Sequence, residues 1–118
     1  MARVVIDEGP ITLAQIERYD DPDIETQLER QGYVPDTTTY RLIELDTADF
    51  EDTGWFPGPR RWGAGMVEAL MRGDSLPPVV VAKTDRGRGY GLIDGLNRLY
   101  AHWAAGRPTI RAYELITG

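Results

Sequence analysis

The fold is decided by one stretch of the sequence, Tyr90-Gly91-Leu92-Ile93-Asp94-Gly95-Leu96-Asn97-Arg98-Leu99-Tyr100-Ala101. Its first four residues are typical of a β-strand, and Asp94-Gly95 is typical of a tight turn. Apolar residues then recur at i, i+3, i+4, i+7 and i+8, which is the clearest helical period in the chain. We therefore predict a helix that ends at Gly106 and buries Leu96, Leu99, Tyr100, Trp103 and Ala104.

The passage from strand to helix predicts an anion site. The first N–H groups of a helix have no partner within it, and the helix dipole adds positive charge there. Gly95 has no Cβ that would keep a ligand away from the backbone. Arg98 offers a planar fork for two phosphate oxygens, and Asn97 adds a neutral donor and acceptor. Gly95, Asn97 and Arg98 are therefore the candidate phosphate ligands.

The same residues also allow a purely structural interpretation. Asp94 can cap the helix, Gly95 can relieve the turn, and Arg98 can be solvated. Asp94 opposes a bound anion unless it caps the helix, faces away, or shares a Mg²⁺ ion with the ligand. In a catalytic interpretation, Asp94 would bind that Mg²⁺ or act as the general base.

Elements on both sides of this stretch indicate an α/β domain with a small mixed sheet. We expect strands at residues 3–6, 40–45, 79–82, 90–93 and 109–115, and helices at 12–19, 23–30, 59–72 and 96–105. Residues 1–39 form an acidic N-terminal helical extension in this scheme, and residues 40–118 form the domain. We expect the extension to be a packed accessory; the alternative is an interaction arm.

Composition restricts the kind of protein. A chain of 118 residues suits one domain with a modest core. No apolar run is long enough for a transmembrane helix, and the N-terminus lacks the pattern of a secretory signal. Cysteine is absent, which excludes disulfides, thiolate metal sites and a cysteine nucleophile. We therefore expect a cytoplasmic location.

Charge is divided unevenly along the chain. Residues 1–54 contain 14 acidic side chains and 4 arginines, whereas residues 55–118 contain 5 acidic and 9 basic side chains. The second half is therefore the part that attracts anions, and the acidic first segment is a candidate surface for a protein partner. A net charge of −6 makes tight nonspecific binding to duplex DNA unfavourable.

A family resemblance extends over much of the chain. The run Leu76-Pro77-Pro78-Val79-Val80-Val81, a short hairpin, the stretch quoted above, Ala105-Gly106 and a closing strand resemble the ParB N-terminal domain. The superfamily includes the ParB partition proteins, the sulfiredoxins and the free serine kinases. The resemblance covers residues 40–116 and is strongest over 76–106. It implies a ParB/sulfiredoxin-like fold in which the glycine-to-arginine box binds the phosphates of CTP, ATP or ADP, with Mg²⁺.

Three departures from the family pattern limit what the resemblance implies. Asn97 stands where the family usually has histidine or arginine, so one cationic phosphate contact is missing. The lack of cysteine excludes sulfiredoxin chemistry. Because the sequence ends at residue 118, we expect no helix-turn-helix or dimerisation region. Pro59-Arg60 matches a Pro-Arg element of partition proteins, which makes Arg60 a further candidate phosphate ligand.

Most other polar and aromatic residues are expected to be structural. We predict that His102 is at the surface and that Trp55 and Trp62 pack rather than stack on a base. Lys83, Arg86 and Arg88 are expected to form a solvated hairpin loop.

Two classes of function remain open. The first is a non-catalytic, phosphate-binding or nucleotide-binding interaction module of a plasmid, phage or host system. The second is a Mg²⁺-dependent enzyme that performs phosphoryl transfer, NTP hydrolysis or nucleic-acid cleavage. The asparagine at position 97 favours the first class.

Overall fold

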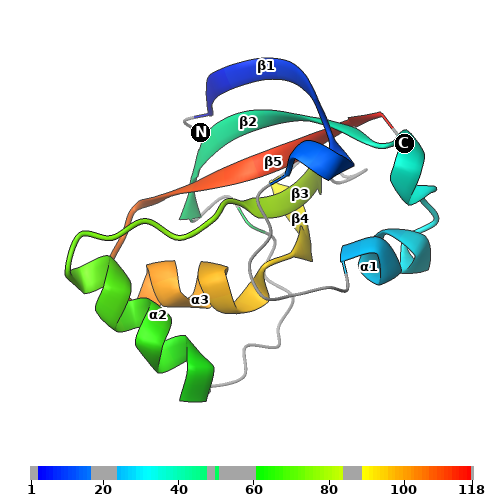
Figure 1. The fold of residues 1–118 in the computed structure, drawn as a ribbon. Helices are drawn as coiled ribbons and strands as arrows, with labels where there is room; N and C mark the ends of the chain where they lie inside the picture. The colour runs from blue at the N-terminus through cyan, green and yellow to red at the C-terminus, as the bar shows by residue number, and fades with distance from the viewer. Residues whose placement is uncertain (1–2, 17–23, 48–49, 51–60, 84–88, 118) are drawn as a thin grey trace.

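The structure is a computed structural model that describes residues 3–16, 24–47, 50, 61–83 and 89–117. Its elements, in chain order, are β1 (Val4–Thr12), η1 (Leu13–Gln15), α1 (Ile24–Arg30), η2 (Pro35–Thr37), β2 (Thr39–Asp46), α2 (Arg61–Met71), β3 (Val79–Lys83), β4 (Tyr90–Asp94), α3 (Leu96–Ala104) and β5 (Thr109–Thr117). Figure 1 shows the strands gathered into one twisted sheet with the helices around it. The mixed α/β class that the sequence predicts is confirmed.

The sheet has five strands in the order β1-β2-β5-β3-β4. Neighbouring strands are antiparallel except β3 and β5, which are parallel. The final strand therefore lies in the middle of the sheet, between two earlier strands. Helix α3 connects the edge strand β4 to this central strand, which places the start of the helix beside the entry into β3.

The core has two parts on opposite faces of the sheet. Successive side chains of a strand point to opposite faces, so Val79 and Val81 lie on one face and Val80 lies on the other. Val79 and Val81 belong to a buried cluster that includes Leu99 of α3. Val80 belongs to a second cluster that includes Leu28 of α1. The sheet is therefore covered on both faces, and α2 packs alongside α3 at one end of it (Figure 1).

The N-terminal segment contributes both a strand and short helices. The predicted strand at residues 3–6 continues to Thr12 and pairs with β2 along its length. Where a helix is expected from Thr12, the chain forms only the single turn η1 and returns to extended backbone at Ile16. The Gln15 Oε1 atom accepts a hydrogen bond from the Thr12 N–H at 2.9 Å. Leu13 and Ile24 are buried in the second cluster, so this part of the extension packs against the sheet.

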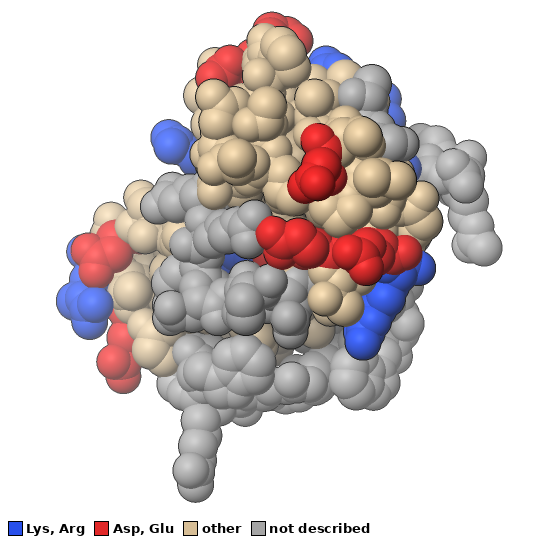
Figure 2. Space-filling model, turned by 45° about the vertical axis from the view of Figure 1, so that its right-hand side comes forward, with Lys and Arg blue, Asp and Glu red and all other residues tan. Residues whose placement is uncertain are grey.

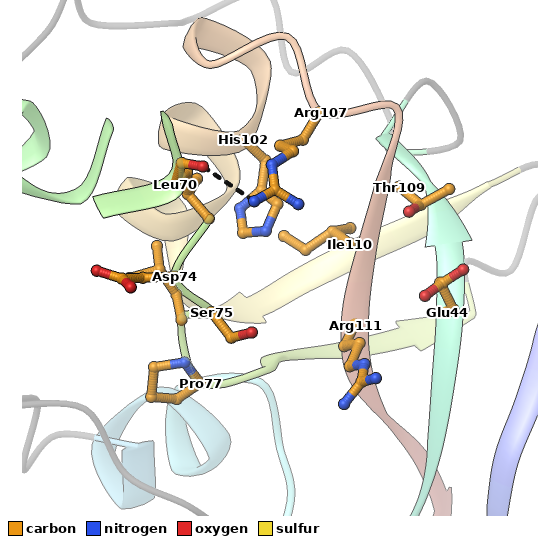
Figure 3. Close-up of a pocket in the computed structure, with 11 residues that line it drawn as sticks. Glu44, Leu70, Asp74, Ser75, Pro77, His102, Arg107, Thr109, Ile110 and Arg111 are labelled. Atoms are coloured by element: carbon orange, nitrogen blue, oxygen red, sulfur yellow. Dashed lines mark hydrogen bonds between the residues drawn. The ribbon is translucent and has the colours of Figure 1, made fainter. Parts of the chain in front are cut away.

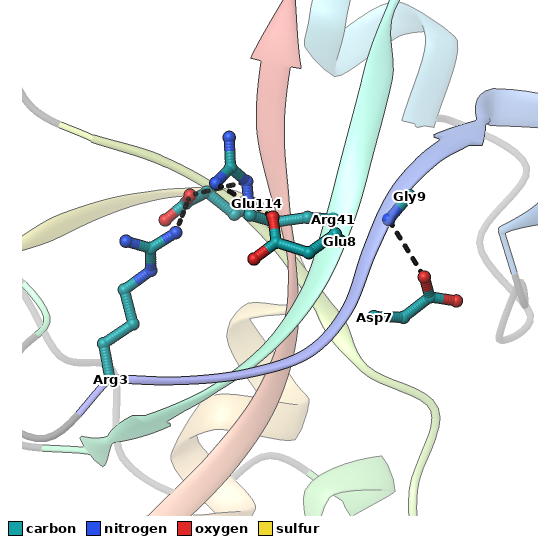
Figure 4. Close-up of polar contacts among 6 residues, drawn as sticks. All are labelled: Arg3, Asp7, Glu8, Gly9, Arg41 and Glu114. Carbon is teal, nitrogen blue, oxygen red and sulfur yellow. Dashed lines mark hydrogen bonds and ion pairs between the residues drawn. The ribbon is translucent and has the colours of Figure 1, made fainter.

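Ion pairs attach the start of the chain to the central strand. The buried carboxylate of Glu114 in β5 lies 2.9 Å from the Arg3 Nη2 atom and 3.3 Å from the Arg41 Nε atom (Figure 4). The Oε2 atom of Glu8 in β1 lies 3.7 Å from the Arg41 Nη1 atom. Because Arg41 stands opposite Glu114 in the β2–β5 register, these contacts fasten the edge strand β1 across β2 to β5.

The surface retains the acidic character of the sequence. Figure 2 shows acidic side chains in a row across the middle of one face, with basic side chains at its margins. This view brings forward the side of the molecule where α1 lies. Within the described residues, the helices are too short or too polar to cross a membrane.

Candidate functional site

The turn between β4 and α3 is formed by a glycine in the left-handed region. Gly95 has φ 109° and ψ 30°, and it is the residue that precedes the first turn of α3. Its carbonyl accepts the first intrahelical bond, from the Leu99 N–H at 2.9 Å. Gly95 has no side chain that could cap the helix, and the Oδ2 atom of Asp94 accepts a hydrogen bond from Arg98. The first amides of α3 therefore receive no cap from the side chain of the N-cap residue.

Packing explains why a glycine is required at position 95. A Cβ atom there would lie 2.6 Å from Val79 Cγ1 and 3.0 Å from Arg98 Nη2. These distances are shorter than van der Waals contact, and a positive φ adds strain for any other residue. The missing Cβ leaves room for neighbouring side chains of the protein, whereas the sequence interpretation assigned that room to a ligand.

Arg98 is buried, with only 4% of its surface exposed. Its Nη1 atom donates to the carbonyls of Pro77 at 3.1 Å and Pro78 at 2.7 Å, and its Nη2 atom donates to Asp94 Oδ2 at 3.2 Å. A buried cation is tolerated when a carboxylate and polar acceptors replace its water. The side chain thereby joins the entry of β3, the end of β4 and the start of α3.

Asn97 occupies a different environment from its neighbour. Its side chain is half-buried in the first turn of α3, and within the described residues it makes no hydrogen bond. Asp94 is paired with Arg98, so the carboxylate beside the helix start has its charge matched by a guanidinium. The helix start thus combines backbone amides of partly buried residues, the Asn97 side chain and the Arg98–Asp94 ion pair.

The prediction that His102 lies at the surface is wrong. Only 8% of this residue is exposed, and its Nδ1 atom lies 2.6 Å from the Arg98 carbonyl. A carbonyl only accepts, so Nδ1 carries the proton and donates. Burial lowers the pKa of His102, and the nearby charges of Arg107 and Arg98 act in the same direction. The ring is therefore neutral at pH 7, and Nε2 is a hydrogen-bond acceptor.

The buried face of α3 also differs from the predicted one. The helix buries Arg98, Leu99, Ala101 and His102. Trp103, which the pattern places in the core, is 36% exposed and donates from Nε1 to the Thr47 carbonyl at 3.0 Å. Arg98 and His102, which contact backbone carbonyls, are buried in α3. The hydrophobic periodicity predicts instead that Tyr100 and Trp103 are buried.

Several predictions concern residues whose placement is not described. Arg60, Trp55, Arg86 and Arg88 lie outside the described residues, as does the side chain of Trp62. Lys83 ends β3 as an exposed side chain. Within the part of the chain that the structure describes, no three histidine or acidic side chains converge as metal ligands do.

No family model and no curated sequence matches the chain. Solved structures do match. ParB from Caulobacter crescentus, crystallised without its C-terminal part and with CTP-gamma-S, is similar with a TM-score of 0.51 and 17% identity, over 62% of this chain and 43% of that one. Sulfiredoxin from Arabidopsis thaliana is similar with a TM-score of 0.52 and 22% identity, over 65% of this chain and 85% of that one.

A third structure agrees with these two. The Pnob8-like ParB-N domain has a TM-score of 0.51 and 15% identity, over 69% of this chain and 32% of that one. The chain thus spans less than half the length of either ParB structure. At such identities the likeness establishes architecture only. The three matches show that this chain, with its mixed five-stranded sheet, has a ParB/sulfiredoxin-like fold.

Proposed function

We propose that the protein is a non-catalytic module that binds the phosphate groups of a nucleotide at the start of α3. The observation that carries this proposal is the helix start itself, which follows the left-handed Gly95 and has no side-chain cap. Uncapped amides at a helix N-terminus, together with the helix dipole, favour a bound anion.

We assign Asn97 and Arg98 separate roles in the proposed site. Asn97 is the side chain that contacts the phosphate, because it stands half-buried in the first turn. Arg98 does not contact the phosphate in this proposal. It stabilises the turn before α3 through its hydrogen bonds to Pro77, Pro78 and Asp94. Its positive charge offsets the Asp94 carboxylate, which would otherwise repel a phosphate. Arg60 remains a predicted contact.

The fold supports a nucleotide as the ligand. The ParB structure from Caulobacter crescentus was crystallised with CTP-gamma-S. CTP is therefore the first ligand to test, followed by ATP and ADP, each with and without Mg²⁺. Since this chain has a neutral Asn97 in the box, we expect weaker binding than a box with an additional cation would give.

Thermal unfolding in the presence of CTP, ATP, ADP and GTP tests the proposal. A ligand that binds only the folded state, present at one hundred times its Kd, stabilises the fold by about 2.7 kcal/mol. We expect at least one nucleotide to raise the Tm, with calorimetry giving its Kd. If none of the four changes the Tm at millimolar concentration, with or without Mg²⁺, the proposal fails.

Two substitutions at Asn97 locate the binding site. Asn97→Ala removes the proposed contact and should weaken nucleotide binding several-fold, whereas Asn97→Arg adds a cation and should strengthen it about tenfold. Arg72→Gln is the matched control, because Arg72 is an exposed cation paired with Asp74 away from the α3 start. Equal affinities in all four proteins would place the ligand elsewhere.

The catalytic alternative is tested on the same ligands. It requires turnover that Asp94→Asn lowers by orders of magnitude, because Asp94 would then bind Mg²⁺ or take a proton. Asparagine keeps an oxygen that can accept a hydrogen bond from Arg98, so the turn should persist. We expect no release of inorganic phosphate from any nucleotide and no cleavage of nucleic acid, because the carboxylate is already held by Arg98.

A protein partner is the second component of the module hypothesis. The row of acidic side chains on the face that includes the α1 side favours a basic partner (Figure 2). Such a partner should be recovered by pull-down with the intact chain, and its binding should weaken at higher ionic strength. It should persist in Asn97→Ala, since that residue belongs to the nucleotide site.

A further inference from the structure

A polar pocket lies between the segment that follows α2, the second half of α3 and the start of β5. Its volume is about 200 Å³, and its lining includes Glu44, Asp74, Ser75, His102, Arg107 and Arg111 (Figure 3). This volume holds about six water molecules at roughly 30 Å³ each, or one small organic ligand. The first residues of α3 do not line this pocket, although Pro77, whose carbonyl accepts from Arg98, does.

His102 gives this pocket a directional acceptor. The residue is nine-tenths buried, and its Nδ1–H is committed to the Arg98 carbonyl at 2.6 Å. The Nε2 atom of the neutral ring can then only accept a hydrogen bond. Within the described residues no group donates to Nε2. A buried acceptor on the wall of a cavity is suited to an O–H or N–H group of a ligand.

The guanidinium groups give the pocket a positive bias. Arg107 donates from Nη2 to the Leu70 carbonyl at 2.9 Å, which is a neutral partner (Figure 3). Arg111 lies across the strand pair from Glu44 in the β2–β5 register. In the described part of the chain, neither arginine forms an ion pair within 4.0 Å.

The acidic groups offset only part of this charge. Asp74 is paired with Arg72 at 3.2 Å on its outer side. Glu44 is then the acidic lining group that stands against the two guanidiniums. The balance is one net positive charge, which a single negative charge on a ligand would neutralise. A carboxylate matches the planar donor fork of an arginine in shape as well as in charge.

We propose that this pocket binds a small 2-hydroxy monocarboxylate. The carboxylate faces Arg107 and Arg111, and the neighbouring hydroxyl donates to the Nε2 atom of His102. Both groups of such an acid lie within a skeleton of three or four carbons, which suits the volume of the pocket. This site is independent of the nucleotide site proposed at the start of α3.

L-Lactate and propionate provide a direct test, because they differ only in the hydroxyl group. We expect lactate to bind the full chain about tenfold more tightly than propionate, which is the effect of one hydrogen bond. His102 is the only histidine in the sequence, so its imidazole NMR signals are unambiguous. Lactate should shift those signals more strongly than propionate does.

Two variants test which residue contacts the hydroxyl group of the ligand and which contacts its carboxylate. In His102→Asn the amide can still donate to the Arg98 carbonyl, but the Nε2 acceptor is gone, so lactate should bind no better than propionate. Arg111→Gln changes an exposed side chain and should weaken both acids several-fold. Arg30→Gln, which changes an exposed cation of α1 outside the lining, should leave both affinities unchanged.

Four results would overturn the proposal. They are no binding of lactate at millimolar concentration, equal binding of lactate and propionate, a lactate preference that survives in His102→Asn, and inorganic phosphate binding as tightly as lactate. The last result would show that the pocket selects charge alone. None of these outcomes depends on a nucleotide, so failure here leaves the α3-start proposal untouched, and the converse also holds.

Discussion

The two ends of α3 carry similar polar side chains but use them differently. At the first turn, the Arg98 guanidinium binds two carbonyls and a carboxylate of the protein itself. At the last turn, His102 binds one carbonyl through Nδ1 and keeps Nε2 as an acceptor, beside the guanidinium of Arg107. The comparison shows that a buried polar residue is a candidate for ligand binding when one of its donor or acceptor atoms has no partner within the protein. Membership of a sequence motif does not decide this.

Replacement of Arg98 tests the structural end of α3 and should have the largest effect. Arg98→Ala leaves Asp94, whose side chain is 11% exposed, without its cation and leaves two carbonyls without a donor. Loss of one partner from a buried pair costs about 3 to 5 kcal/mol. Urea unfolding of the variant and the wild type measures this difference in the free energy of unfolding.

The exposed pair Arg72–Asp74 is the matched control for that measurement. Its side chains are 66% and 57% exposed, so water screens the interaction. Arg72→Gln should change the free energy of unfolding by less than about 0.5 kcal/mol. Similar losses in Arg98→Ala and Arg72→Gln would contradict the structural role of Arg98 and return it to the list of candidate ligand residues.

Gly95→Ala should have an intermediate effect on stability. The new Cβ would meet Val79 Cγ1 at 2.6 Å while the backbone stays at φ 109°, so the side chain and the turn must both shift. We expect a loss of about 1 to 3 kcal/mol in unfolding free energy. Gly73→Ala is the control, since it has φ 93° but no atom within 4 Å of its Cβ position. The difference between the two variants isolates the contacts with Val79 and Arg98 from the cost of the positive φ.

The pH dependence of stability tests the other end of α3 and should be the smallest effect. Burial lowers the pKa of His102 in the folded state, so the unfolded chain takes up a proton at its ordinary pKa of 6.5 while the folded chain does not. The stabilisation is therefore complete above pH 6.5 and is lost as the pH falls toward the folded pKa. The loss is at most about 1.4 kcal/mol per pH unit.

The comparison with His102→Asn isolates the contribution of this residue to the pH dependence. Urea unfolding at about pH 7.5 and about pH 5.5 should show a smaller decrease for the variant than for the wild type. An NMR titration that places the pKa of this sole histidine at or above 6.5 in the folded protein would contradict the buried, neutral ring.

Local signals were sufficient to predict most of the fold. The expected strand over residues 90–93, the Asp-Gly turn and the helix that follows agree with β4 and α3 to within a residue or two. The order of strands in the sheet was not available from local patterns, because it depends on contacts between distant residues. The full extent of β1 was missed because its side chains are mostly exposed, so they carry little hydrophobic pattern.

The candidate site was harder to predict than the fold. The sequence located the turn and its glycine, but it gave no means of knowing that Arg98 points inward to the Pro77 and Pro78 carbonyls. Backbone acceptors are present at every residue, so only the tertiary structure shows which of them meet a given side chain. The same reason explains His102, which lies beside Leu70 of α2 and Ile110 of β5 in the tertiary structure.

The central position of β5 has a consequence for synthesis on the ribosome. Residues 109–117 pair with β2 on one side and β3 on the other, so the sheet stays in two separate halves until this strand has left the exit tunnel. Until that moment β1 with β2 and β3 with β4 can form only as isolated two-stranded ribbons, which are marginally stable in water. The nascent domain therefore acquires its cooperative stability only after residues 109–117 have emerged.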